Sequence, residues 1–233
     1  NTYGIKEIHI EDDNFTFKKQ YVLEFCKKIK SMFPDLTWTC PNGVRIDTLD
    51  EEMVQAMKES GCYALSLGIE SGNNDTLKMM KKSLNKEKVL EKIEMIKKFG
   101  IDINAFFILG YPGETRQHVE NTINFALSLP LKRASFANFQ PLPGTEAYHS
   151  LIEKGLLKIN HWETFNPSLQ STIWSPPGFT THELSWLRRK ALLKFYLRPR
   201  IVFDMLKGIK SFSHFIYVAK RGIRWLTFTG KKK

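Results

Sequence analysis

The stretch DINAFFILGYPGET, residues 102–115, decides the fold that the sequence predicts. A run of strand-forming residues leads into a polar turn that contains the pair Pro112-Gly113, and a helical pattern follows over residues 114–129. A strand, a short loop and a helix of these lengths form one βα unit. The sequence repeats this unit, which predicts a parallel sheet covered by helices.

Hydrophobic periodicity places the other elements of the predicted sheet. We expect strands over residues 7–10, 37–40, 64–68, 102–109 and 135–140, and helices over residues 20–33, 51–60, 85–99 and 114–129. Asp50 is an expected N-cap of the second helix. Gly61 and Gly100 stand just beyond predicted helix ends, where a left-handed residue is often needed.

The loop after each predicted strand contains glycine, charged residues or both. These loops are residues 11–15, 41–45, 68–72, 110–115 and 140–145. Taken alone, such a loop is more often a turn or a helix cap than a binding site. Because the carboxyl ends of parallel strands meet at one edge, where ligands of such folds bind, the five loops together predict a site.

The same loops resemble a known family. The matching strings are Glu11-Asp12-Asp13-Asn14-Phe15-Thr16, Asn42-Gly43-Val44-Arg45-Ile46-Asp47, Gly68-Ile69-Glu70-Ser71-Gly72, Gly110-Tyr111-Pro112-Gly113-Glu114-Thr115 and Pro141-Leu142-Pro143-Gly144-Thr145. In this order, over residues 1–156, they resemble the radical S-adenosylmethionine (SAM) superfamily. Within it, they are most similar to enzymes with an amino-terminal cobalamin-binding domain.

The resemblance implies an α/β fold, a partial (β/α)6 radical SAM barrel missing its first strand. In the family that strand carries a C-x-x-x-C-x-x-C loop, which binds a [4Fe–4S] cluster. Cys26, Cys40 and Cys62 lack this spacing and are better explained as small buried hydrophobic residues. We therefore expect a fragment that contains no metal ligands and is inactive by itself, while the full-length protein is an enzyme.

The resemblance also assigns contacts to SAM. Glu70 matches the residue that reaches the ribose or amino group of SAM, where a carboxylate makes a charge-assisted hydrogen bond. Ser71 and Gly72 would let the backbone approach the ligand closely. Ile108 and Gly110 resemble the strand that flanks the adenine, although the glycine-to-glutamate spacing, which ends here at Glu114, is one residue longer than usual.

Four further residues are expected at the mouth of the barrel. Asp12, Asp13 and Arg45 would hold the SAM carboxylate or the substrate, and Gln140 would contact substrate or SAM. Arg45 has an equally good explanation as the salt-bridge partner of Asp47 or Asp12, and Gln140 as an amide that stabilises a turn. No catalytic residue is assigned.

The function implied by the resemblance is radical chemistry on a small-molecule or lipid-like substrate. In the family, a reduced cluster splits SAM and the 5′-deoxyadenosyl radical abstracts hydrogen from substrate, while the protein orients the reactants. Related enzymes also use cobalamin for methyl transfer or ring rearrangement, which implies an upstream cobalamin-binding domain. Two alternatives remain: an RNA-modifying radical SAM methylthiotransferase, and a degenerate barrel that binds SAM-like ligands without catalysis.

Charge divides the chain into unlike parts. Between Arg188 and Lys233 there are fourteen Lys and Arg against one acid, Asp204, so this segment carries +13 in a chain whose formal charge is +11. We expect a barrel domain over residues 1–159, an irregular connection over 160–187 and a basic helical extension over 188–233. With neither a signal peptide nor a membrane-spanning run visible, we expect a cytoplasmic protein.

The basic extension leaves several partners open. Its large apolar residues recur at helical spacing between the charges, which predicts an amphipathic helix that docks on something. Packing on the rest of the enzyme, contact with an anionic membrane surface, and nucleic acid are the alternatives, in that order. The residues expected to dock are Phe195, Phe203, Phe212 and Trp225.

Overall fold

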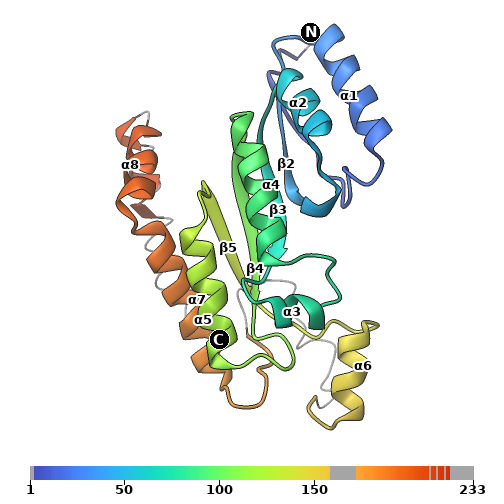
Figure 1. Cartoon of the computed structure of the whole chain (residues 1–233). Helices are drawn as coiled ribbons and strands as arrows, with labels where there is room; N and C mark the ends of the chain where they lie inside the picture. The colour runs from blue at the N-terminus through green and yellow to red at the C-terminus, as the bar shows by residue number, and fades with distance from the viewer. Residues whose placement is uncertain (1–2, 158–171, 210, 214, 218, 221–233) are drawn as a thin grey trace. The chain divides into compact units, whose positions relative to one another are not determined.

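The computed structural model describes residues 3–157, 172–209, 211–213, 215–217 and 219–220 (Figure 1). The chain divides into two compact units. Unit 1 comprises Asn1–Phe107 and Arg116–Ser135, and unit 2 comprises Ile108–Thr115 and Phe136–Lys233. Each unit is described by itself below.

The described residues contain a five-stranded sheet whose order is β1-β2-β3-β4-β5. Neighbouring strands pair in parallel from β1 to β4. Each new strand is added on the same side as the last, so the order never reverses as it does in doubly wound sheets. This arrangement confirms the partial barrel that the resemblance implies. The strands are β1 (Glu7–His9), β2 (Thr37–Val44), β3 (Cys62–Glu70), β4 (Asp102–Leu109) and β5 (Arg133–Asn138).

Helices cover one face of the strands in unit 1 (Figure 1). They are α1 (Lys19–Met32), α2 (Glu51–Glu59), α4 (Lys86–Lys98) and α5 (Arg116–Ser128), while the short helix α3 (Asn74–Met79) lies beyond the end of β3. Val89, Ile93 and Ile96 of α4 are buried, as are Leu65 and Leu67 on β3. Each such side chain contributes about 1.5–3 kcal/mol through burial, which makes this layer the core of the unit.

Trp38 on β2 organises the first part of that core. It is fully buried, and the rings of Phe15 and Phe25 meet it edge-on at centroid distances of 5.8 and 5.3 Å. Its indole Nε1–H donates to the Ser60 carbonyl oxygen at 3.0 Å. The buried donor is thereby satisfied, which is the condition for placing an indole in a core.

Local signals expected from the sequence are confirmed at the helix ends. The Asp50 side chain accepts a hydrogen bond from the Met53 backbone N–H at 2.9 Å, as an N-cap does. Gly61 and Gly100 have φ of +96° and +67°. These left-handed conformations end α2 and α4 without the steric cost that a Cβ atom would add.

Two features of the strands differ from the prediction. Strand β2 continues to Val44 through a register shift between Cys40 and Val44, so the expected loop over residues 41–45 is largely part of the strand. Strand β5 ends at Asn138, which leaves Gln140 beyond the strand that it was expected to end. A bulge of this kind has no reliable periodicity in sequence.

Unit 2 contains helices α6 (Glu146–Glu153), α7 (Thr181–Tyr196) and α8 (Pro199–Lys207). Helix α7 begins at Thr181, inside the connection expected to be irregular over 160–187, so that expectation is wrong for its last seven residues. Residues 160–171 of the connection lie outside the described residues. The division into three segments stays a prediction.

The aromatic residues expected to dock the extension have different environments. Phe195 is fully buried, whereas Phe203 and Phe212 are 57% and 77% exposed. Trp225 lies outside the described residues. In the part of the chain that is described, no helix is long and apolar enough to cross a membrane.

The turn after β3 is fixed against α5 within unit 1. Ser71 Oγ lies 2.8 Å from Thr122 Oγ1, and the Gly72 backbone N–H donates to the same oxygen at 3.0 Å. A Cβ atom added at Gly72 would lie 2.4 Å from Phe125 Cβ and 2.9 Å from Thr122 Cα. Only glycine allows this close approach of strand end and helix.

We predict that Gly72→Ala lowers the free energy of unfolding by about 1–3 kcal/mol, the usual cost of overpacking. Gly208→Ala is the matched control, because its added Cβ would meet only ordinary contacts, the nearest at 3.4 Å. Chemical denaturation of both variants measures the difference. Equal stability of the two variants would show that the turn can move away from α5.

Candidate ligand-binding site

A pocket of about 210 Å3 opens in unit 1 at the carboxyl ends of β2 and β3. Its polar lining comes from four different segments: the loop after β1, the end of β2, the end of β3 and the segment after α3. The polar side chains are those of Asp13, Asn42, Arg45, Asp47, Glu70, Lys82 and Ser83. Carboxylates and cations therefore face the same small volume.

Glu70, the last residue of β3, has an unusual backbone conformation, shared among the described non-glycine residues by Lys81. Its φ is +67°, a left-handed conformation that is uncommon for a residue with a side chain. Lys82 Nζ donates to Glu70 Oε1 at 3.0 Å, and the glutamate side chain is only 17% exposed. Sparsely populated backbone conformations of this kind cost about 1–3 kcal/mol and cluster at binding and active sites.

The end of β2 supplies a second ion pair. Arg45 donates through Nε and Nη2 to the two carboxylate oxygens of Asp47, at 3.1 and 2.6 Å. The hydrogen bond from Arg45 lowers the pKa of Asp47, and the positive charges of Arg45 and Lys82 add to the effect. The sequence-based alternative of an Arg45–Asp47 salt bridge is thus what the structure contains.

Glycines shape the walls of the pocket. Gly43 has a φ of +105°, and a Cβ added there would lie 3.2 Å from the Phe106 ring. A Cβ at Gly68 would lie 2.9 Å from Glu70 Oε1. Both glycines therefore leave room beside a side chain that lines the pocket.

Hydrogen bonds hold the loop after β1 against the end of β2. Asn42 Nδ2 donates to the Glu11 carbonyl oxygen at 2.8 Å, and the Asn14 backbone N–H donates to Asp12 Oδ1 at 2.7 Å. Asp12 thus stabilises its own loop, while the adjacent Asp13 lines the pocket. The ligand contact predicted for Asp12 stays a prediction.

Of the residues predicted from sequence, Asp13, Arg45 and Glu70 line the same pocket. Ser71 and Gly72 instead contact α5 through Thr122, so the glycine is needed for the approach of a helix. Their approach to a ligand stays a prediction. The structure adds Lys82, which sequence reasoning missed because the short helix α3, which fixes the spacing between Glu70 and Lys82, was not recognised.

Unit 2 contains the other three predicted residues. The Gly110 backbone N–H donates to Glu114 Oε2 at 2.7 Å, and an added Cβ at Gly110 would lie 2.4 Å from Leu184. Ile108 and Gln140 are half-buried. The roles predicted for Ile108, Gly110 and Gln140 in binding adenine or substrate stay predictions.

The structure shows what the side chain of Glu114 does, which the unusual spacing between glycine and glutamate did not settle. Its carboxylate is 3% exposed and accepts backbone hydrogen bonds from Gly110 and Tyr111, at 2.7 and 3.0 Å. A buried carboxylate with such donors stabilises the turn that follows β4.

The cysteines do not form a cluster site. Cys26, Cys40 and Cys62 are free and buried, as expected. Burial raises the pKa of the Cys40 thiol to about 12, and it raises the pKa of the Cys26 and Cys62 thiols as well. Metal binding requires thiolates. Within the described residues, no group of three or more His, Cys, Asp or Glu side chains could hold a metal ion, so these residues do not fit a [4Fe–4S] cluster.

Comparison with known proteins identifies the family. Residues 2–126 match the model of the radical SAM superfamily, which is more than half of the chain. The chain belongs to this superfamily. The matched region contains β1 to β4 and the whole lining of the pocket.

Two relatives are named as methyltransferases. An uncharacterized methyltransferase of Pyrococcus horikoshii is 36% identical over 224 residues, which is 96% of this chain and 47% of the relative. Cytidylyl-2-hydroxyethylphosphonate methyltransferase of Streptomyces wedmorensis is 33% identical over 162 residues, 66% of this chain and 30% of the relative. The chain thus spans about half, or less, of the length of these relatives.

A solved structure supports the fold. The radical SAM methyltransferase TsrM of Kitasatospora setae, determined with cobalamin and a [4Fe–4S] cluster bound, matches with a TM-score of 0.59 at 16% identity. The match covers 85% of this chain and 39% of that protein. At this identity the likeness concerns the fold alone.

We predict that the Arg45–Asp47 pair makes stability depend on pH in the acid range. A carboxyl group with a lowered folded-state pKa stabilises the protein above its unfolded value, near 3.8, and this contribution is lost as pH falls through the folded value. Asp47→Asn should therefore flatten the decline in stability below about pH 4. Melting temperatures measured against pH test this; an unchanged acid slope in Asp47→Asn would contradict it.

Proposed function

We propose that the pocket of unit 1 binds S-adenosylmethionine, and that the full-length protein uses it as a radical SAM methyltransferase acting on a small-molecule substrate. The observation that carries the proposal is the left-handed Glu70, held by Lys82 in a pocket that also contains Arg45 and Asp13. Membership of the superfamily and the methyltransferase relatives support it.

The charges of the pocket fit the polar groups of SAM. The ligand has a carboxylate, an ammonium group and a ribose diol, which need cationic donors on one side and carboxylate acceptors on the other. Lys82 and Arg45 are the donors for the carboxylate, and Glu70 and Asp13 the acceptors for the ammonium group and ribose. In the structure, Lys82 and Glu70 form an ion pair with each other.

Binding would exchange these internal pairs for pairs with the ligand. Lys82 is 36% and Arg45 52% exposed, so both cations can turn toward a ligand, and the ligand's ammonium group would replace Lys82 as the partner of the 17% exposed Glu70. Phe106, together with the space beside Gly43, offers an apolar surface in the same pocket. These residues would bind and orient the ligand and exclude water from it.

In this family SAM supplies the radical or the methyl group when bound. The chain would contribute position: β3 is fixed by the contact of Gly72 with α5, so Glu70 has a defined place. Because the described residues do not fit a cluster, we propose that the ligands of the cluster, and a cobalamin-binding domain, belong to other parts of the full-length protein.

The alternatives have less support. A methylthiotransferase that modifies RNA would need a small β-rich domain after the barrel, but the described residues 172–209 are dominated by the helices α7 and α8. A non-catalytic barrel is disfavoured by relatives named as enzymes. The phosphonate methyltransferase among them supports a small-molecule substrate.

We predict that Glu70→Gly in the full-length protein weakens SAM binding about ten- to hundredfold, the loss expected for one charge-assisted hydrogen bond. Glycine adopts the left-handed conformation without strain, so the same substitution should leave folding intact. This separates binding from stability in one variant. Isothermal titration calorimetry and thermal unfolding measure the two effects.

Glu91→Gln is the matched control, because it removes an exposed carboxylate on α4 outside the pocket. Its SAM affinity should equal that of the unmodified protein. If Glu70→Gly binds SAM as tightly as Glu91→Gln, the carboxylate belongs to the scaffold and the proposed site is wrong.

A further inference from the structure

Helix α7 in unit 2 has two apolar stripes on opposite faces. Leu184, Leu187, Ala191 and Phe195 recur at three- and four-residue steps, and all four are buried. A second stripe, offset by about half a turn, consists of Trp186, Leu193 and Leu197. These three side chains are 52%, 36% and 68% exposed.

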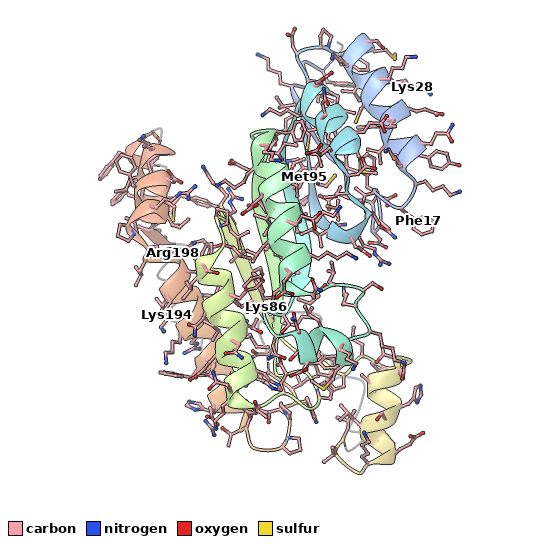
Figure 2. All side chains as sticks on the ribbon, in the orientation of Figure 1. Phe17, Lys28, Lys86, Met95, Lys194 and Arg198 are labelled. Atoms are coloured by element: carbon pink, nitrogen blue, oxygen red, sulfur yellow. The ribbon has the colours of Figure 1, made fainter. Side chains whose placement is uncertain are left out.

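The second stripe needs an explanation because a helix that packs with one face usually presents polar residues on the other. Lys190 stands within the stripe, and its ammonium group lies 4.9 Å from the centroid of the Trp186 ring. Lys194, next to Leu193, is exposed (Figure 2). Aromatic, aliphatic and cationic side chains thus share the exposed face.

Helix α8 repeats the pattern in the same unit. Phe203 and Leu206 are 57% and 54% exposed and lie one turn apart. Lys207 Nζ lies 4.4 Å from the centroid of the Phe203 ring. As with Lys190 and Trp186, the lysine covers an aromatic ring four residues earlier on its helix. We use the name basic apolar stripe for Trp186, Lys190, Leu193, Lys194, Leu197, Phe203, Leu206 and Lys207, all of them exposed except the half-buried Lys190.

We propose that the basic apolar stripe of α7 and α8 binds the anionic surface of a lipid bilayer. Amphipathic helices at such surfaces combine Trp, Phe and Leu on the inserted side with Lys and Arg beside them. The charge is complementary to acidic headgroups, since residues 188–233 carry +13. The inference is independent of the SAM site in unit 1.

The composition favours a bilayer over other occupants. Cores of protein interfaces are depleted in lysine, whereas here lysines cover the exposed aromatic rings. Sites for nucleic acid rely on cations and stacking aromatics, and aliphatic side chains such as Leu193, Leu197 and Leu206 add nothing to them. A bilayer surface accommodates all three kinds of side chain.

Flotation of the full-length protein with vesicles tests the proposal. We expect binding to vesicles of phosphatidylcholine with about one-third phosphatidylserine, and little to phosphatidylcholine alone. Binding should fall steeply between about 0.1 M and 1 M salt, because the screening length shortens from about 10 Å to about 3 Å. Absence of flotation at low salt, or flotation insensitive to salt, would overturn the proposal.

Paired variants locate the surface. Trp186→Gln with Leu197→Gln should weaken vesicle binding at least about tenfold, and Lys194→Glu at least about fivefold. The controls are Phe17→Gln with Met32→Gln, which changes two apolar residues of unit 1 that are each 66% exposed, and Lys28→Glu on α1 (Figure 2). The control variants should bind as the unmodified protein does.

Three results would count against the stripe. They are equal binding by stripe and control variants, protection of the Trp186 and Leu197 side chains from hydroxyl-radical footprinting in the lipid-free full-length protein, and binding to single-stranded RNA without flotation. The second would assign the stripe to another part of the same protein, and the third to nucleic acid. SAM affinity measured alongside would remain unchanged in the stripe variants, so failure here leaves the proposed function untouched.

Discussion

The contact between Gly72 and α5 is the constraint on which the candidate site depends. A Cβ atom at position 72 would lie 2.4 Å from Phe125 Cβ, so only glycine fits there. Hydrogen bonds that Ser71 and Gly72 make with Thr122 hold this turn against α5. Strand β3 therefore ends at a defined place. The turn just before this contact leaves Glu70 in a left-handed conformation with its carboxylate toward Lys82. The local strain is supported by the packing around it.

Much of the barrel could be predicted from the sequence because its signals are local and repeated. Periodic apolar positions located the helices that flank the sheet, and strand β4 was predicted to the residue. The bulge in β2 and the helix α3 were missed, since a bulge depends on partner strands and α3 has only six residues. Boundaries set by tertiary contacts carry little signal in one sequence.

The residues of the candidate site were likewise predicted only where their signals are local. Arg45 and Glu70 were found because they follow strands whose carboxyl ends meet at one edge. Lys82 was missed, although it lies only twelve residues beyond Glu70, because its approach depends on the unrecognised α3. Ser71 and Gly72 were correctly placed in the loop after β3, but the structure shows them in contact with Thr122 of α5. No sequence pattern predicts this contact.

A crystal structure of the full-length protein with SAM shows directly whether SAM binds in the pocket of unit 1. We expect the methionyl carboxylate within hydrogen-bond distance of Lys82 or Arg45, and Glu70 hydrogen-bonded to the ribose or ammonium group. The Lys82–Glu70 pair would then be opened or shared with the ligand. SAM bound elsewhere, with this pair intact and the pocket free of ligand, would show that the pocket is not the SAM site.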